Sequence, residues 1–152
     1  MLREVLIRLF PLHNQNGLAK FVAMDIDKVK YWAEISDYDL ETAEAMLQTK
    51  RWLYVGFMCH QTIEKIFKAY WCSKIEGTSP MSHNLINIAQ SCGLNDLMSE
   101  EQKMFISEIM PLNIESRYPS YKQRLAEGLS EEKCRELIDN TKSLQIWIKG
   151  LL

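Results

Sequence analysis

Three ionisable side chains recur at four-residue intervals within residues 57–71, namely His60, Glu64 and Lys68. In a helix, residues four apart lie one turn apart on the same face, so each adjacent pair could touch. On a solvated face the pairs would stabilise the helix by only about 0.2–0.5 kcal/mol each. On a packed helix the same spacing would place an acid beside a base in a groove. The spacing alone leaves both interpretations open.

The helix predicted around these residues is too apolar to lie on the surface. One face carries Met58, Gln61, Glu64 or Lys65, Lys68 and Trp71, and a second, mostly apolar stripe carries Val55, Cys59, Thr62, Ile66, Ala69 and Ser73. A helix that is apolar on more than one face is typical of the centre of a bundle. Charged groups there must be paired or line a groove, because burial of an unpaired charge is costly. The pattern therefore indicates where a site would lie.

His83 follows a loop that contains Gly77 and Pro80, at the mouth of a short predicted helix. An imidazole at that position could act as an acid–base group or hold an anion at the helix N-terminus. It could equally stabilise the loop through a hydrogen bond to a backbone carbonyl. His83 is therefore a candidate site residue with a structural alternative.

Arg117 and Tyr118 stand beside Pro119, which restricts the backbone of a predicted loop. A guanidinium group suits a phosphate, and a tyrosine ring suits a base or an apolar wall. The alternative is that Arg117 anchors the loop by binding helix-end carbonyls or a carboxylate. The residue types do not decide between these two roles.

The motifs of several large enzyme classes are absent from the sequence. It contains no P-loop, no G-x-G-x-x-G and no G-x-S-x-G. The histidines are scattered and form neither H-E-x-x-H nor a Cys/His knuckle, so we expect no metal and no cofactor. The cysteines form no C-x-x-C pair and are predicted to be reduced thiols of a cytoplasmic protein: Cys59, Cys72, Cys92 and Cys134.

Length and composition indicate one globular domain. The chain has 152 residues, of which 47% are apolar and 25% charged, enough for a substantial core. The formal net charge of −2 shows no basic excess of the kind that marks nucleic-acid binding, although it is compatible with a local patch. A membrane span would need about 20 apolar residues, so no membrane association is expected.

The elements that must position these residues are predicted to be helical throughout. Apolar residues recur at three- and four-residue steps in about five segments, which are residues 25–49, 52–75, 82–93, 99–110 and 130–151. Asp25, Ser82 and Ser99 are predicted to cap three of them. No segment alternates apolar and polar residues in the manner of a strand. We therefore predict an all-α, up-and-down bundle of about five helices.

Two stretches are predicted to be loops. Residues 11–17 contain Pro11 and Gly17 and would separate a short amphipathic segment from the bundle. Residues 117–121 lie where the helical periodicity fades, and they are predicted to form an ordered loop. The expected organisation is an N-terminal extension over residues 1–23, followed by one helical domain over residues 24–152.

Four short landmarks stand in order along the predicted domain. They are Asp39-Leu40-x-x-Ala43, Gln61-x-x-Glu64-Lys65-x-x-Lys68-Ala69, Ser82-His83-Asn84-Leu85 and Arg117-Tyr118-Pro119. In this order and spacing the chain resembles the HEPN domain family, which occurs in higher eukaryotes and prokaryotes and for which nucleotide binding has been proposed. The resemblance implies an up-and-down helical bundle, commonly a homodimer. It also implies frequent pairing with a small nucleotidyltransferase, as a neighbouring gene product or a fused domain.

Many members of that family are ribonucleases that act as toxins, as in toxin–antitoxin systems. Their signature is an arginine followed, after four to six residues, by a histidine, with catalysis at the groove of the dimer. Here no histidine follows Arg117, and none occurs after His83. The usual group for moving a proton near neutral pH is therefore missing from this motif. The leading hypothesis is a non-catalytic, dimeric HEPN module.

This module would bind a nucleotide, an RNA segment or a nucleotidyltransferase partner in a polar groove of five residues: Glu64, Lys68, His83, Arg117 and Tyr118. Arg117 and Lys68 would meet phosphate or an acidic partner, and Tyr118 would offer a stacking face. Glu64 would orient the cations. One alternative is a divergent endoribonuclease in which Arg117 stabilises the transition state, His83 serves as acid or base, and Glu64 orients one of them. The other is a structural adaptor, marked by a large exposed apolar patch.

Overall fold

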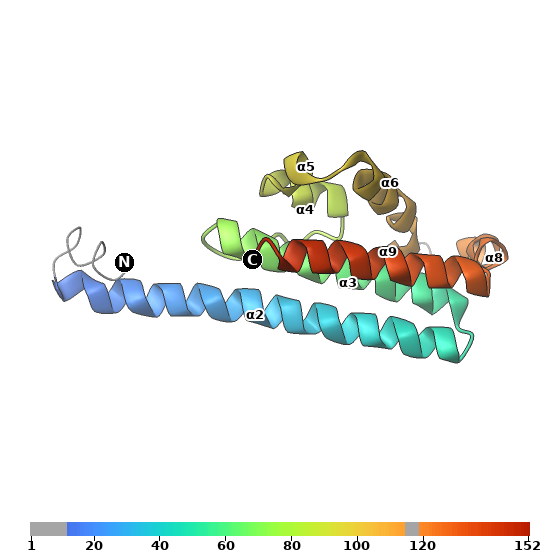
Figure 1. The fold of residues 1–152 in the computed structure, drawn as a ribbon, viewed down its shortest axis with the longest axis horizontal. Coiled ribbons are helices and arrows are strands. Elements are labelled where there is room, and N and C mark those ends of the chain that lie inside the picture. Colours follow the sequence, from blue (N-terminus) through green and yellow to red (C-terminus); the bar gives the residue numbers. More distant parts are fainter. Residues whose placement is uncertain (1–11, 115–118) are drawn as a thin grey trace.

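The computed structural model describes residues 12–114 and 119–152, and every regular element in these ranges is a helix (Figure 1). Three long helices pack along one another, α2 (Leu12–Gln48), α3 (Trp52–Lys74) and α9 (Glu131–Lys149). On the side of α3 and α9 opposite to α2 lie α4 (Leu85–Ser91), α5 (Leu94–Leu97) and α6 (Glu100–Ile109). Helix α7 (Pro111–Ile114) packs on α3, and α8 (Pro119–Gly128) precedes α9. The all-α prediction is confirmed, and none of the described helices is both long and apolar enough to cross a bilayer.

The five predicted helices are all present, and the capping signals explain where several of them begin. The hydroxyl of Ser99 accepts a hydrogen bond from the Gln102 N–H, while the Gln102 side chain accepts one from the Ser99 N–H, which is the predicted capping box. The hydroxyl of Ser130 caps α9 by accepting a hydrogen bond from the N–H of Lys133. Of the additional helices, α5 and α7 have four residues each, and a segment of about one turn shows little periodicity in the sequence. The third, α8, has ten residues and lies where the helical periodicity fades.

The first helix begins much earlier than its predicted start at residue 25. Helix α2 runs without interruption from Leu12, so the prediction of a loop is wrong for residues 12–17, and Asp25 is an internal residue rather than a cap. No proline stands between residues 12 and 48. A single glycine such as Gly17 weakens a helix by about 1 kcal/mol without ending it. Residue 11 lies outside the described ranges.

Two further boundaries differ from their predictions. The cap of α4 is Asn84, whose side chain accepts a hydrogen bond from the Asn87 N–H, whereas the hydroxyl of Ser82 accepts from the N–H of Asn84 itself. Asparagine and serine are equally good caps, so residue type could not decide between them. Residues 119–121 are helical rather than a loop, since α8 begins at Pro119, and proline suits the first helical position. Residues 117–118 lie outside the described ranges.

Helix α3 is the centre of the bundle, as its two apolar faces predicted. It contacts α2, α4, α7 and α9, and most of its side chains are buried. Those fully excluded from solvent include Val55, Cys59, Ile63, Ile66, Phe67 and Ala69. His60, Glu64 and Lys68 are buried as well. Their four-residue spacing therefore belongs to a packed helix and not to a solvated face.

A buried polar contact ties the three long helices together. The Ser36 hydroxyl of α2 donates to the backbone carbonyl of Thr62 in α3 at 2.8 Å, and the Gln145 amide of α9 donates to the Ser36 oxygen at 2.9 Å. Asp37, the next residue of α2, pairs with Lys149 and accepts a hydrogen bond from Gln145. A buried hydroxyl that both donates and accepts allows little sliding. This contact therefore sets the axial positions of α2 and α9 against α3.

None of the four cysteines, all of which lie in the described ranges, forms a disulfide, in line with the prediction of reduced thiols. Cys59, Cys72 and Cys134 are buried, and Cys92 is half-buried. Burial raises the pKa of Cys59 to about 12 and that of Cys134 to about 11. Both thiols therefore stay protonated and unreactive near neutral pH.

Candidate functional site

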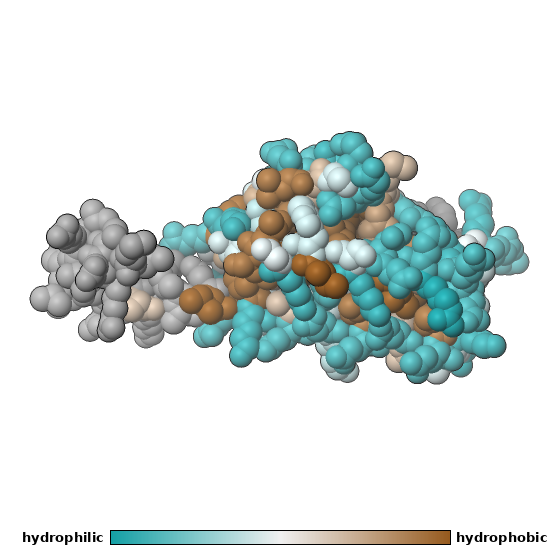
Figure 2. Space-filling model, in the orientation of Figure 1, coloured by the Kyte–Doolittle hydropathy of each residue, from teal (hydrophilic) through white to brown (hydrophobic). Residues whose placement is uncertain are grey.

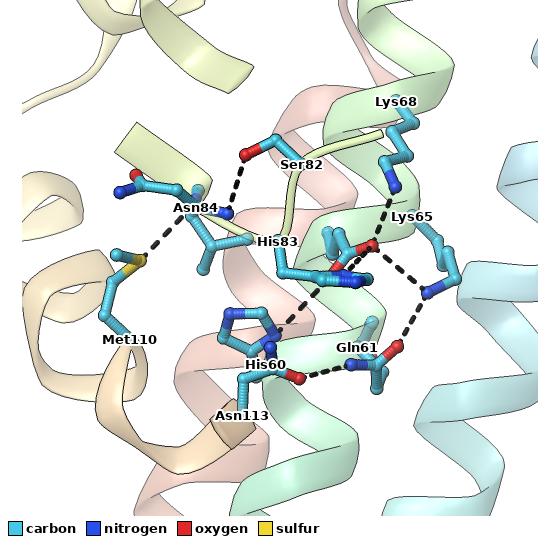
Figure 3. Close-up of polar contacts among 12 residues, drawn as sticks. His60, Gln61, Lys65, Lys68, Ser82, His83, Asn84, Met110 and Asn113 are labelled. Atoms are coloured by element: carbon cyan, nitrogen blue, oxygen red, sulfur yellow. Dashed lines mark hydrogen bonds and ion pairs between the residues drawn. The ribbon is translucent and has the colours of Figure 1, made fainter. Parts of the chain in front are cut away.

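Lys65 and Lys68 of the central helix and His83 of the loop before α4, all labelled in Figure 3, lie around the carboxylate of Glu64. Its side chain is 1% exposed, and Lys68 Nζ lies 2.8 Å from its Oε1. Lys65 Nζ lies 3.6 Å from the same oxygen, and His83 Nδ1 lies 3.0 Å from Oε2. Three groups that carry or can carry a positive charge thus surround one buried carboxylate. We call these four residues the Glu64 cluster.

Glu64 is ionised despite its burial. Burial by itself would raise the pKa of the carboxyl, but the hydrogen bond from Lys68, the charge of Lys65 and the hydrogen bond from His83 hold the pKa below its usual 4.5. An ionised carboxylate can only accept hydrogen bonds. His83 must therefore donate from Nδ1, which leaves Nε2, on the opposite side of the ring, open to a ligand.

His83 is the accessible member of the cluster. Its side chain is 62% exposed, whereas those of Glu64 and Lys68 are almost wholly buried. The chain after it is held in place because Asn84 caps α4 and the N–H of Leu85 contacts Met110 Sδ at 3.3 Å. The partner of the His83 ring is the carboxylate of Glu64, and not a backbone carbonyl that would stabilise the loop. An imidazole held in this way can exchange a proton or donate a hydrogen bond to an anion.

Helix α2 closes the cluster from the other side. Lys68 Nζ lies 5.2 Å from the centre of the Trp32 ring, a cation–π contact that adds to its ion pair with Glu64. The ammonium group of Lys68 thus contacts both Glu64 and the Trp32 ring, and the Lys68 side chain is only 7% exposed. Its position favours a role in holding the cluster together over the expected direct contact with phosphate.

A row of hydrogen bonds links the cluster to α7. Lys65 Nζ donates to Gln61 Oε1 at 2.7 Å, and Gln61 Nε2 donates to Asn113 Oδ1 at 2.7 Å. The pKa of the Asp39 carboxyl in α2 is raised above its usual value. Burial is the largest cause, the charge of Lys65 lowers the pKa, and the charge of Glu64 raises it. The Lys65 side chain is 16% exposed, more than that of Lys68, so it is the lysine better placed to meet a ligand.

His60 is buried beside the cluster without joining it. Its Nδ1 lies 3.9 Å from Glu64 Oε2, beyond hydrogen-bond distance, and neither ring nitrogen makes a hydrogen bond of ordinary geometry with the described residues. Burial lowers the pKa of His60 to about 4, so the ring is neutral near neutral pH. Of the two predicted contacts in the row His60, Glu64 and Lys68, the first is an approach of 3.9 Å without a hydrogen bond, and the second is a hydrogen bond of 2.8 Å.

The structure brings three of the predicted site residues to one point, Glu64, Lys68 and His83. Arg117 and Tyr118 lie outside the described residues, so the groove predicted with them is not placed. Trp32 and Asn113 contribute to the site although neither is a predicted site residue. A polar Gln61 on a buried helix face implied that some partner must satisfy it, but one sequence does not reveal which residue that is.

The described residues contain no arrangement of three His, Cys, Asp or Glu side chains that could hold a metal ion. At the Glu64 cluster itself, Lys65 and Lys68 would repel a divalent cation. The chemistry that these side chains offer is proton exchange at His83 and the binding of an anion.

Apart from the Glu64 cluster, the surface has a groove where α2 passes the end of α3 and the C-terminus. It has a volume of about 740 Å³, and its mostly apolar lining includes Ile26, Val29, Ala33, Ile75 and Leu152. Figure 2 shows apolar side chains gathered on this part of the surface. This is the kind of exposed apolar surface that an adaptor would use, and it contains none of the Glu64 cluster.

Comparison with known proteins agrees with this architecture. The family model described as the HEPN domain matches residues 29–151. The crystal structure of the protein TT1696 from Thermus thermophilus is similar with a TM-score of 0.71 and 15% sequence identity, over 82% of this chain and 98% of that chain. At such low identity the likeness concerns the fold alone. No curated protein sequence matches the chain.

Proposed function

The chain belongs to the HEPN domain family, and from this premise we propose that it is a non-catalytic, dimeric module that binds the phosphate of a nucleotide or an RNA. The site is the Glu64 cluster, and the groups that meet the phosphate are Nε2 of His83 and the ammonium of Lys65. On the ground of residue type alone, we also propose Arg117 as a phosphate ligand and Tyr118 as a face for a base.

One observation supports this proposal above the others. The exposed imidazole of His83 is held by the buried carboxylate of Glu64, whose single negative charge is exceeded by the positive charges around it. Glu64 contributes one negative charge, while Lys65 and Lys68 contribute two positive charges before His83 takes up a proton. Asp39 offsets part of this excess from α2. An imidazole with a proton on both nitrogens donates a charge-assisted hydrogen bond from Nε2 to a phosphate oxygen.

The residues support binding over cleavage. Acid–base cleavage of RNA needs one group that accepts a proton and another that donates one. His83 is the single accessible histidine among the side chains that the structure describes, because His60 is fully buried. The segment after Arg117 supplies no second histidine.

A titration of a labelled RNA oligonucleotide by fluorescence anisotropy tests the proposal. We expect His83→Ala and Lys65→Met each to raise the Kd about five- to ten-fold. Each should also reduce the magnitude of the slope of log K against log salt by about one, the contribution of one phosphate contact. Met81→Ala, in the same loop and 98% exposed, and Lys103→Met on α6 should bind like the wild type. Absence of saturable binding to RNA and to mononucleotides, or equal affinity of all four variants, would contradict the proposal.

The second candidate function, a divergent endoribonuclease, is favoured by the bond between Glu64 and His83. In enzymes with a histidine base, a carboxylate at Nδ1 fixes the tautomer and leaves Nε2 to move the proton. The test is incubation of the purified protein with a mixed RNA pool, beside Arg117→Ala and His83→Ala. Cleavage that disappears in both variants would establish this function. No cleavage above that of the variants would leave the binding module.

The protein partner that we propose is a small nucleotidyltransferase, in keeping with the family. Co-expression with such a protein, followed by sedimentation analysis, should give a complex that contains two copies of this chain. If no nucleic acid or nucleotide binds, but this complex forms, the protein is an adaptor. Substitution of the groove residue Val29 by aspartate should then weaken the complex, while His83→Ala should not.

A further inference from the structure

The Glu64 cluster continues onto the surface of α2 through an unbroken series of contacts. Lys68 Nζ, which pairs with Glu64, lies 5.2 Å from the centre of the Trp32 ring. That ring meets Tyr31 edge-to-face, with 5.3 Å between the ring centres. Tyr31 is 58% exposed. The series therefore leads from the accessible imidazole of His83 to an aromatic ring that is open to water.

A second exposed tyrosine extends this aromatic surface along the helix. Tyr38 is 70% exposed and follows Tyr31 by seven residues, which places it on the same face about 10 Å further along α2. Ile35 stands between them and is half-buried. Two aromatic rings open to water on one face, the first of which is connected through Trp32 to Lys68, are suited to a ligand that has both flat apolar faces and negative charge.

We propose that Tyr31 and Tyr38 form a base-stacking platform, so that the ligand of the Glu64 cluster is single-stranded RNA and not a free nucleotide or a duplex. This inference rests on the proposed function. Bases in a duplex stack on one another, whereas unpaired bases can be splayed out to stack on aromatic side chains. The two positions are about 10 Å apart along the helix axis, and stacked bases are about 3.4 Å apart, so a strand that stacks on both rings is extended.

The charges on α2 define the side on which the phosphates run. Glu34 and Glu41 each follow one of the tyrosines by three residues and are exposed. These carboxylates repel phosphate from the outer side of α2, whereas Lys65 and His83 attract it toward α3. The bases then lie over the tyrosines, with the phosphates between the tyrosines and the loop of His83.

The test compares three probes with the full-length protein: a single-stranded RNA of about eight nucleotides, the same sequence as a duplex, and AMP. We expect the single strand to bind at least about ten-fold more tightly than either competitor. Tyr31→Ala and Tyr38→Ala should each raise the Kd about ten-fold, the size of one lost stack, and leave the salt dependence unchanged, since neither removes a phosphate contact.

Matched variants distinguish the contribution of the aromatic ring from that of the tyrosine hydroxyl. Tyr31→Phe and Tyr38→Phe keep the stacking face and should bind within about two-fold of the wild type. Tyr54→Ala, at the start of α3 and 50% exposed, should also leave the affinity unchanged. Melting temperatures within about 3 °C of the wild type will show that the exposed substitutions preserve the fold.

The outcomes distinguish this inference from the proposed function. RNA binding that is weakened by His83→Ala but not by the tyrosine variants would overturn the platform and leave the phosphate site standing. Equal affinity for single strand and duplex would do the same. If the wild type binds none of the three probes, both proposals fall. If the alanine variants turn a dimer into a monomer without altering RNA affinity, this face is an interface between copies and the platform is wrong.

Discussion

A single carboxylate neutralises the buried charge of Lys68, and replacement of Glu64 by glutamine would remove that charge while keeping the shape of the side chain. Both residues are buried, so Lys68 would keep its burial without its counter-ion. We expect the free energy of unfolding of Glu64→Gln to fall by about 3 kcal/mol, measured by urea denaturation at neutral pH.

The control for this substitution is an exposed pair with the same spacing. Glu34 pairs with Lys30 at 3.7 Å on the surface of α2, and both side chains are well exposed. Glu34→Gln should change the free energy of unfolding by no more than about 0.5 kcal/mol. Similar losses in the two variants would mean that burial does not strengthen the dependence of Lys68 on Glu64.

His60 makes the stability depend on pH in a defined window. In the folded protein its pKa is lowered from 6.5 to about 4, so between these values the unfolded chain takes up a proton that the folded chain does not. Stability is therefore lost as the pH falls from about 6.5 to about 4, by up to about 3 kcal/mol. Protonation of Glu64, whose pKa is also lowered, removes further stability below pH 4.5.

The variant His60→Leu isolates the contribution of the buried imidazole. Urea midpoints measured across the window should decline with falling pH less steeply in the variant than in the wild type. At neutral pH the variant should be at least as stable, because leucine leaves no buried nitrogen without a partner. An unchanged slope would show that His60 takes up its proton in the folded state as readily as in the unfolded state.

At the scale of helices, periodicity predicted the five main helices, whereas only one of the three predicted caps, Ser99, was correct. The stripe over residues 52–75 identified the central helix to within one residue, and the capping box at Ser99 was found in place. The start of α2 was missed because a helix stops at a specific breaker, and Gly17 is not a strong enough one. Three members of the Glu64 cluster were predicted, but the contact of Lys68 with Trp32 and that of Gln61 with Asn113 depend on tertiary packing that spacing does not encode.

The contact between α2, α3 and α9 gives a test at this scale. Ser36→Ala removes a hydroxyl that satisfies both the Gln145 amide and the Thr62 carbonyl. We expect a loss of about 1–3 kcal/mol in the free energy of unfolding, since the buried amide of Gln145 would lose one of its partners. Ser143→Ala, where an exposed hydroxyl of α9 bonds its own helix, serves as the control and should change stability by about 0.5 kcal/mol or less.

At the scale of the whole molecule, α2 is longer than the bundle that it supports. Its first turns project beyond the ends of α3 and α9 (Figure 1), and the family match begins only at residue 29. The folded core therefore requires the part of α2 that carries Trp32 and Ser36, and not its beginning. This is compatible with residues 1–23 being an extension, although the helix itself crosses that boundary.

Removal of residues 1–23 should accordingly lower the melting temperature by no more than about 3 °C, as followed by circular dichroism. Removal of residues 1–40, which takes away Trp32 and Ser36, should prevent folding. Sedimentation of the shorter deletion gives a second result. A change of oligomeric state without loss of helicity would show that the projecting turns join copies of the chain.

The burial of the thiols has a practical consequence for following this protein in solution. Burial raises the pKa of Cys59, Cys92 and Cys134, and Cys72 is shielded by packing. Met81 is 98% exposed, two residues before His83. A maleimide dye should therefore react with a Met81→Cys variant at one position, with the native cysteines left in place. Its fluorescence would report the arrival of a ligand at the loop without any substitution in the Glu64 cluster.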